Sequence, residues 1–323
     1  MTGLTRRTML QVSAAAGVAG LFAGTARADA PEGLKLAEAE PFSFDWLKRH
    51  ARDLAGQPYQ APPRPDPEVV QRIDYDAHGK LDYRMDYALF PDSAYPISFQ
   101  HVGMYFPKTV RMHKVTSGGE AREVLYDPGY FDVGPDHVAS ELPAEPSAFA
   151  GFWVHQPRSK GPLSEVEPWA TFLGASYFRG IGEEGQVGLS ARGIALDPGG
   201  AGPEEFPDFR AFWFEPAARA AEPVTVYALL DGPSVAGAYK FRLHRGEGVV
   251  MDIEAHLHLR QPVNRLGLAP LTSMYWFSET RKETMTDWRP EVHDSDGLHL
   301  WTGAGERIWR PLNNPERVAI SSF

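Results

Sequence analysis

Strict alternation of apolar and polar residues between positions 249 and 260 is the feature that most restricts the fold of this chain. In VVMDIEAHLHLR, one set of alternate residues is apolar and the other is largely polar or charged. Side chains of a β-strand point to opposite faces in turn, so the segment predicts a strand with one apolar face. Apolar segments at 224–230 and 239–244, joined by the turn-rich residues 231–238, predict two more strands.

Turn-forming residues are frequent along the whole chain, which has 31 glycines and 28 prolines among 323 residues. Such a composition favours short strands over long helices. From about residue 71 onward the pattern is strand-like, and helical and strand-like segments do not alternate regularly. The sequence therefore predicts an all-β protein, built as a large β-sandwich or a related fold.

A short helix is expected ahead of the strands, in SFDWLKRHARDLAG at 43–56. Ser43 can cap its first turn and Gly56 can end it. The apolar residues that would share one face are Leu47, Ala51 and Leu54. The proline-rich residues 62–67 must be extended or turned, which predicts a linker. We therefore expect a helix and linker at 29–70 and the sandwich at 71–323.

Residues 1–28 have the layout of a twin-arginine export signal. Arg6 and Arg7 precede a mildly apolar run, and an Ala-Arg-Ala site for cleavage follows at 26–28. An N-terminal membrane helix is the alternative, but the run is too short and too rich in alanine and glycine to span a bilayer. We predict a mature chain that begins at Asp29, lies in the periplasm and is not embedded in the membrane.

Charge and cysteine content exclude several classes of function. The formal net charge of −10 disfavours a nucleic-acid partner, because an acidic surface repels phosphates. The absence of cysteine excludes disulfides, thiolate nucleophiles and cysteine-ligated metals.

The polar face expected at 249–260 is the first candidate site, with Asp252, Glu254, His256 and His258. Neighbours on one strand face lie about 6.5–7 Å apart. Zinc needs ligands at about 2.0–2.2 Å, so adjacent side chains would have to bend inward to share an ion. We interpret the face as solvent-exposed and leave a sugar-binding groove open.

The second candidate is FLGASYFRG at 172–180 together with GLSARGIALD at 188–197. Neither segment contains a nucleotide-binding glycine motif or a serine-hydrolase elbow. Tyr177, Phe178 and Arg179 could stack on a sugar or hydrogen-bond to it. The alternative is a pair of core strands with one buried charge.

The third candidate is EVHDSDGLHLWTG at 291–303. Inverting hydrolysis of a glycoside needs two carboxyl groups about 6.5–9.5 Å apart, on opposite sides of the sugar. Asp294 and Asp296 could reach that separation, but they belong to one short segment and would approach from one side. At most one of them is catalytic, and a capped Asp-Ser-Asp-Gly turn is the alternative. Aromatic residues that could hold a sugar ring occur nearby, at Tyr275, Trp276, Trp288, Trp301 and Trp309.

Six long motifs in this chain resemble the osmoregulated periplasmic glucan biosynthesis proteins of the G and D family. They are FLGASYFRG, GLSARGIALD, EEFPDFRAFWF, YALLDGPSVAGAYKF, LGLAPLTSMYWF and HDSDGLHLWTGAGERIWRPLNNP. The resemblance runs from about Phe42 to the last residue, and the twin-arginine signal favours the D branch of the family.

The resemblance implies a large β-sandwich similar to galactose mutarotase, followed by a smaller immunoglobulin-like domain. The implied ligand is β-1,2-linked glucan, and the implied activity is its hydrolysis with inversion. Asp294 would be the general base, acting through a relay. The general acid and a relay tyrosine would lie beyond Phe323. On this basis we expect the chain to be truncated at its C-terminus, to lack the second domain and to be inactive by itself.

Substrate contacts are expected from residues of the matched motifs, namely Tyr177, Arg179, His293, Asp296, Trp301 and Arg310. No cofactor and no metal are implied. A glucan-binding scaffold protein that works with the membrane glucan synthase is the main alternative. A mutarotase-like or lyase-like enzyme using His256 or His258 is a further one.

Overall fold

The described part of the chain forms two large β-sheets, four small two-stranded sheets and three short α-helices. The computed structural model describes residues 33–134, 136–157, 161–187, 189–200, 202–311 and 322, so the predicted export signal lies outside them. The helices are α1 (Phe44–Ala55), α2 (Pro67–Arg72) and α3 (Tyr75–His78), and the 3₁₀ turns are η2 (Met85–Tyr87), η3 (Pro128–Tyr130), η4 (Val138–Glu141), η5 (Leu163–Glu165) and η6 (Glu279–Thr284).

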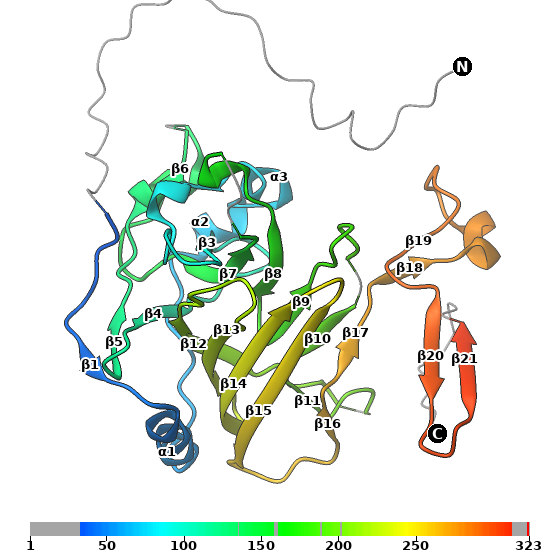
Figure 1. The fold of residues 1–323 in the computed structure, drawn as a ribbon. Helices are drawn as coiled ribbons and strands as arrows, with labels where there is room; N and C mark the ends of the chain where they lie inside the picture. Colours follow the sequence, from blue (N-terminus) through cyan, green and yellow to red (C-terminus); the bar gives the residue numbers. More distant parts are fainter. Residues whose placement is uncertain are drawn as a thin grey trace, which may run out of the picture. The chain divides into compact units, whose positions relative to one another are not determined.

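The longer sheet has seven strands in the order β1-β5-β4-β12-β13-β14-β15 (Figure 1). Their bounds are β1 (Glu40–Pro41), β4 (Arg111–Val115), β5 (Glu120–Glu123), β12 (Asp208–Glu215), β13 (Val224–Asp231), β14 (Val235–Arg245) and β15 (Val249–Leu259). The pair β4–β12 is parallel, and the other neighbours are antiparallel.

The second sheet has six antiparallel strands in the order β17-β10-β9-β8-β7-β3. Their bounds are β3 (Ile97–His101), β7 (Phe149–His155), β8 (Pro168–Leu173), β9 (Tyr177–Gly180), β10 (Ser190–Arg192) and β17 (Leu271–Thr272). Four two-stranded sheets complete the structure, formed by β2 (Asp82–Tyr83) with β6 (Phe131–Asp132), β11 (Ile194–Leu196) with β16 (Leu266–Leu268), β18 (Tyr275–Phe277) with β19 (Val292–His293), and β20 (Gly297–Trp301) with β21 (Arg307–Pro311).

Aromatic side chains from the two large sheets meet in one core. The ring of Phe152 on β7 lies 4.9 Å from that of Phe212 on β12, and Phe172 on β8 lies 5.1 Å from Phe241 on β14. All four side chains are buried. Because these contacts join one sheet to the other, the molecule is a β-sandwich, and the predicted all-β sandwich fold is confirmed.

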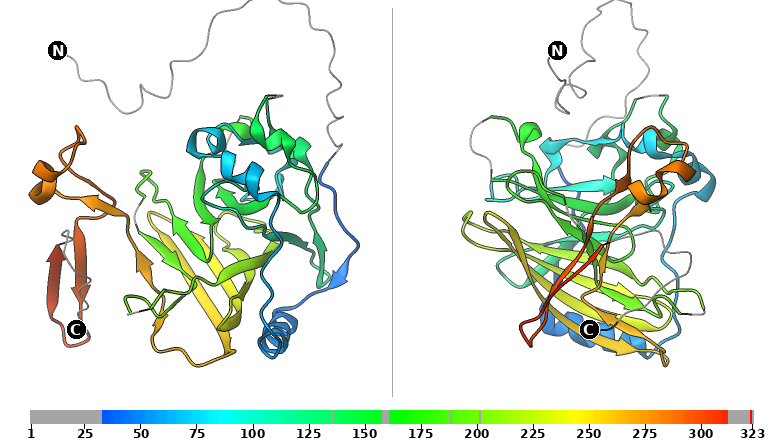
Figure 2. Two further views of the ribbon diagram at one scale, coloured as in Figure 1. Left: turned by 180° about the vertical axis from the view of Figure 1, so that it is seen from behind. Right: turned by 90° about the vertical axis from the view of Figure 1, so that its right-hand side faces the viewer.

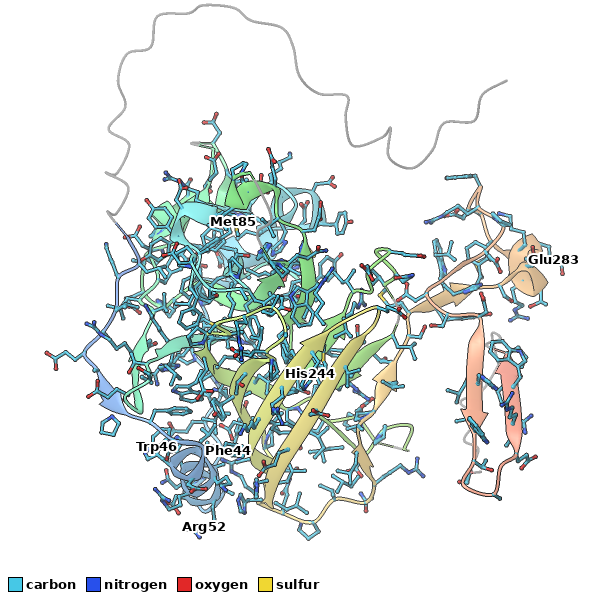
Figure 3. All side chains as sticks on the ribbon, in the orientation of Figure 1. Phe44, Trp46, Arg52, Met85, His244 and Glu283 are labelled. Carbon is cyan, nitrogen blue, oxygen red and sulfur yellow. The ribbon has the colours of Figure 1, made fainter. Side chains whose placement is uncertain are left out.

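Helix α1 covers the outer face of the seven-stranded sheet (Figure 2, left). The alternation within β12 explains this, because Phe212 faces the sandwich core while Trp213 faces the helix side. Leu47 and Ala51 of α1 are fully buried in that second cluster. The predicted caps are also confirmed, since the Trp46 N–H donates to Ser43 Oγ at 3.1 Å and Gly56 ends the helix. Figure 3 labels Phe44 and Trp46 at its start.

The predicted link at 231–238 is wrong in its extent. Strand β14 begins at Val235, so the turn between β13 and β14 needs few residues. The small residues that suggested a turn instead permit close packing. A Cβ on Gly237 would lie 2.8 Å from the Leu257 side chain of β15, and Ala238 is fully buried in the cluster beneath α1.

Residues 62–73 join the sandwich directly. Pro67 opens helix α2 behind the capping side chain of Asp66, and Val69 and Val70 belong to the sandwich core. Within the described residues, no helix is long and apolar enough to cross a membrane.

Candidate functional site

A row of side chains crosses the outer face of the six-stranded sheet. Its members, one from each of five neighbouring strands, are Trp153, Thr171, Arg179, Ser190 and Thr272. Successive members are register partners from β7 to β8, from β8 to β9 and from β10 to β17. Between β9 and β10, Arg179 Nε donates to Ser190 Oγ at 2.9 Å. Directly opposed residues share a sheet face, so these five form one continuous surface, here named the cross-strand row.

The sequence places this row outside because its strands alternate. Each of three row members has a phenylalanine next to it that points into the core. Phe152 precedes Trp153, Phe172 follows Thr171, and Phe178 precedes Arg179. Burial of these phenylalanines therefore fixes the register, and with it the outward direction of the row.

A cleft of about 490 Å³ lies over the cross-strand row. All five members of the row line it, together with Tyr105, Tyr177 and Asp294. It shares Tyr105, Phe106 and Trp153 with a second cavity of about 710 Å³ over β3 and β7. The two cavities therefore form one extended groove across the sheet.

Asp294 reaches the groove from a loop outside the six-stranded sheet. It follows β19, and its backbone N–H donates to the Met274 carbonyl at 2.9 Å. Its Oδ2 accepts the Met274 N–H at 3.3 Å. Met274 lies two residues beyond Thr272 at the end of the row, so this double contact fastens Asp294 to the same end. Among the described residues that line the 490 Å³ cleft, Asp294 is the only carboxylate.

The side chain of Asp294 does accept a backbone N–H, but not as a local turn would require. The donor is Met274, across the β18–β19 pair, rather than a residue of the Asp-Ser-Asp-Gly segment itself. The carboxylate is thereby held between two segments, and Asp294 is exposed to solvent.

His293 and Asp296 lie beside Asp294 without lining the cleft. The His293 ring stacks on Tyr275 at 5.4 Å, its Nε2 lies 2.9 Å from Glu291 Oε2, and its Nδ1 lies 3.7 Å from Asp296 Oδ1. The Asp296 side chain is 87% exposed. His293 can steady the strand that carries Asp294, and direct contact of either residue with a ligand stays a prediction.

Trp301 and Arg310 lie on the β20–β21 hairpin, on opposite faces. Trp301 is the register partner of Arg307, whose guanidinium lies 4.8 Å from the indole ring. Arg310 is the partner of Leu298, one position out of phase. One small ligand on this hairpin therefore cannot contact both side chains from one face, and neither lines the described groove.

Sequence reasoning missed Trp153, Thr171 and Tyr105 as groove residues. The signal for Trp153 was present in FAGFWVH, where it lies between Phe152 and Val154, both buried in the core. A tryptophan out of phase with core residues on a central strand must face outward, where it is available to a ligand.

Three of the four candidate residues on the polar face of β15, namely Asp252, Glu254 and His256, pair with a neighbouring side chain. His244 Nε2 on β14, labelled in Figure 3, lies 3.0 Å from Asp252 Oδ2, and His256 Nε2 lies 2.9 Å from Glu254 Oε1. His256 also lies against Phe44 of α1, with ring centroids 5.8 Å apart. Within the described ranges, no three histidine or acidic side chains gather as they would around a metal ion.

The 490 Å³ cleft combines aromatic rings, hydroxyl groups, the guanidinium of Arg179 and the carboxylate of Asp294. The adjoining cavity adds the carboxylates of Asp82, Glu165 and Glu167. Aromatic faces cover the apolar faces of sugar rings, while hydroxyl and guanidinium groups hydrogen-bond to neutral polar ligands. Such a surface is typical of proteins that bind saccharides.

Comparison with known proteins identifies the family. The model of the family described as "Periplasmic glucan biosynthesis protein, MdoG" matches residues 42–323. The chain belongs to this family of periplasmic glucan biosynthesis proteins, which confirms the resemblance seen in the motifs.

Several curated relatives carry the corresponding name. "Glucans biosynthesis protein D 2" of Ralstonia nicotianae is 51% identical over 328 residues, which covers 99% of this chain and 60% of the relative. "Glucans biosynthesis protein D" of Stenotrophomonas maltophilia is 44% identical, covering 96% of this chain and 58% of the relative. The protein of that name in Xylella fastidiosa is 44% identical, covering 90% and 53%. The chain thus spans somewhat more than half the length of these relatives.

Proposed function

We propose that the groove over the six-stranded sheet binds the backbone of a periplasmic glucan, a β-1,2-linked glucose polymer. The observation that carries this proposal is the convergence of Tyr177, Arg179 and Asp294 on one cleft. They come from segments more than a hundred residues apart, and each was singled out by its motif. The length of the groove suits several sugar rings, and its aromatic and hydroxyl groups suit a sugar polymer.

We further propose that Asp294 is the general base of an inverting hydrolase in the full-length protein. Its carboxylate is held by Met274 at the end of the cross-strand row, where a water molecule could bind beside a sugar. A second carboxyl group is needed on the opposite side of the sugar. Asp294 is the only carboxylate among the described residues of this cleft, although Asp82, Glu165 and Glu167 line the adjoining cavity. On the strength of the family resemblance, we propose that the acid comes from sequence beyond Phe323.

The same observation favours a second candidate, a non-catalytic glucan-binding protein that acts with the membrane synthase. A cleft with one carboxylate has hydroxyl and aromatic groups for binding but lacks the acid–base pair for hydrolysis. In that case Tyr177, Arg179 and Trp153 would carry the function.

Replacement of Asp294 by asparagine separates the two candidates. In the full-length protein, Asp294→Asn should lower the rate of hydrolysis of linear β-1,2-glucan by about 10²–10⁴-fold, since a general base is lost. Glucan affinity should stay within about threefold, because the amide keeps the acceptor for the Met274 N–H. Product chromatography and calorimetric titration measure these quantities.

Asp296→Asn is the matched control and should keep hydrolysis within a few-fold of wild type. Full hydrolytic rate in Asp294→Asn would contradict the role of Asp294. A wild-type protein that binds glucan but never shortens it would exclude the hydrolase and support the non-catalytic function.

We propose that residues 1–28 direct export by the twin-arginine route, on the evidence of Arg6, Arg7 and the following Ala-Arg-Ala site. Mass spectrometry of the periplasmic protein should then find Asp29 at the N-terminus. Recovery of a membrane-held chain that still begins at Met1 would exclude this route.

A further inference from the structure

The cross-strand row continues onto β3, where a serine is paired with a histidine. Ser98 of β3 is the register partner of Trp153, so it extends the row by one strand. Ser98 and His155 of β7 both line the cavity of about 710 Å³ that adjoins the cleft. Asp294 is fastened near Thr272 at the opposite end of the row, so the pair belongs to a different part of the groove.

Ser98 and His155 have the geometry of a nucleophile and its base. Ser98 Oγ lies 2.7 Å from His155 Nε2. His155 Nδ1 lies 2.8 Å from the Val166 carbonyl oxygen, which can only accept, so Nδ1 carries the hydrogen. The lone pair at Nε2 therefore accepts the Ser98 hydroxyl hydrogen. A hydroxyl held by a base that a third group orients is the arrangement that activates serine for attack.

The surroundings of His155 keep its ring neutral and able to take a proton. Burial lowers the pKa of His155, and the Val166 carbonyl and the Glu167 carboxylate only partly oppose this. The ring is therefore a neutral base at pH 7. Glu167 also lines the cavity, where its charge would stabilise the imidazolium that forms during attack.

Trp153 supplies a donor for the negative charge that attack on a carbonyl creates. It stands directly opposite Ser98 on the neighbouring strand and lines the same cavity. Within the described residues its indole N–H has no hydrogen-bond partner. A donor beside the nucleophile can stabilise an oxyanion, which is usually a large contribution to catalysis of acyl transfer.

We propose that Ser98 and His155 form a second active site, which removes neutral O-acyl groups such as acetyl from the hydroxyls of a bound saccharide. A serine activated by histidine performs acyl transfer. An acyl group with its own carboxylate is disfavoured, because Asp82, Glu165 and Glu167 line the cavity. The saccharide part of this substrate rests on the proposed function of the groove, whereas the reactivity of the serine does not.

The reaction balances without a cofactor or an oxidant. Ser98 Oγ bonds to the ester carbonyl carbon while His155 Nε2 takes the hydroxyl proton. The bond from that carbon to the sugar oxygen then breaks, the sugar oxygen takes the proton from His155, and the acyl group remains on Ser98. Water next gives a proton to His155 and its oxygen to the acyl carbon, which releases the carboxylic acid and restores the serine.

A fluorophosphonate probe tests the reactive serine without any saccharide. We expect the folded, full-length protein to gain one phosphonyl group, which peptide mass spectrometry places on Ser98. His155→Gln should slow the labelling of Ser98 by at least about a hundredfold, since the base is lost. Ser234→Ala is the matched control and should leave it unchanged, because Ser234 is also buried but donates to Glu205 rather than to a histidine.

Absence of an adduct on Ser98 in the folded wild type would overturn the proposal and leave the pair as a structural hydrogen bond. Equal labelling rates in wild type and His155→Gln would overturn it as well. The wild-type measurement needs no substitution, so it decides the question even where a variant fails to fold.

An acetylated β-1,2-glucan oligosaccharide tests the substrate class. We expect the full-length protein to release acetate at least roughly tenfold faster than it releases a dicarboxylic acid from the corresponding half-ester, because the cavity carboxylates repel the second charge. Acetate release that persists in Ser98→Ala would overturn the proposal. Labelling of Ser98 in a protein that binds no glucan would support the reactive serine and contradict the proposed function, so the two failures are distinguishable.

Discussion

Arg179 is the charged member of the cross-strand row, and its neighbours fix its direction. Ser190 Oγ accepts the Nε–H at 2.9 Å, and within the described residues the terminal nitrogens have no hydrogen-bond partner, so they can serve a ligand in the cleft. Fixing the side chain before binding reduces the rotamer entropy lost when a sugar hydroxyl is bound.

Arg179→Met should therefore weaken binding of β-1,2-glucan by roughly ten- to a hundred-fold. A hydrogen bond from a charged donor contributes about 1.5–3 kcal/mol, and methionine keeps most of the packing. Calorimetric titration of the full-length protein with a linear glucan measures the change.

Ser190→Ala is the matched comparison for Arg179→Met. It leaves the guanidinium in place and removes only the bond that orients it, so its effect on affinity should be smaller. An Arg179→Met protein that binds glucan as tightly as wild type would remove Arg179 from the binding surface.

Among the elements, the turn between β8 and β9 passes close to the Phe106 ring, which lines the cleft. Gly174 has a φ of +77°, and a Cβ at this position would lie 2.8 Å from the Phe106 ring. Both residues line the cleft, and Tyr177 follows at the start of β9. Glycine thus lets the turn pass directly against the ring.

Gly174→Ala should destabilise the protein by more than Gly185→Ala does. Gly185 has a similar φ of +76°, but nothing lies within 4 Å of its added Cβ. Left-handed backbone costs an alanine about 1–2 kcal/mol in both proteins, and only Gly174→Ala adds a clash with Phe106. Urea unfolding measures both, and equal losses would show that the Phe106 ring yields freely.

Local patterns predicted the elements that depend on local physics. Helix α1 followed from Ser43, its apolar face and Gly56, and strand β15 followed from the alternation of apolar and polar residues. The start of β14 was missed because glycine and alanine are common in turns. Here Gly237 and Ala238 allow close packing, which depends on tertiary structure. Tyr177, Arg179 and Asp294 line the same cleft because of long-range strand pairing, which spacing along the chain cannot reveal.

At the scale of the whole molecule, buried histidines link stability to pH. His101 and His113 are buried, and burial lowers the pKa of each to about 4. His101 Nδ1 lies 2.8 Å from the Val102 carbonyl oxygen, so it carries the proton, and Nε2 accepts from the Tyr126 hydroxyl at 3.1 Å. The folded protein therefore holds the neutral ring.

Stability should fall as the pH drops from about 6.5 toward 4. In this window the unfolded chain takes up protons that the folded state refuses, since the folded pKa is the lower one. The loss should reach about 3 kcal/mol for each histidine across the window. Urea midpoints at pH 7.5, 6 and 5 measure it.

His101→Gln should reduce the slope of stability against pH, whereas replacement of the exposed His299 should not. An unchanged slope in His101→Gln would show that this ring is not a source of the acid sensitivity.

Neither large sheet is built only from strands that are consecutive in the sequence, and this has a consequence for synthesis on the ribosome. The chain passes repeatedly from one sheet to the other, and the parallel pair β4–β12 joins residues about a hundred positions apart. The seven-stranded sheet is complete only when Leu259 has emerged, and the six-stranded sheet when Thr272 has. At about 5–20 residues per second, the two events fall within roughly three seconds of each other. Until Arg245 has emerged, the phenylalanines of β7 and β8 lack their partners from β12 and β14, so nascent chains should be held longest by chaperones at 149–173.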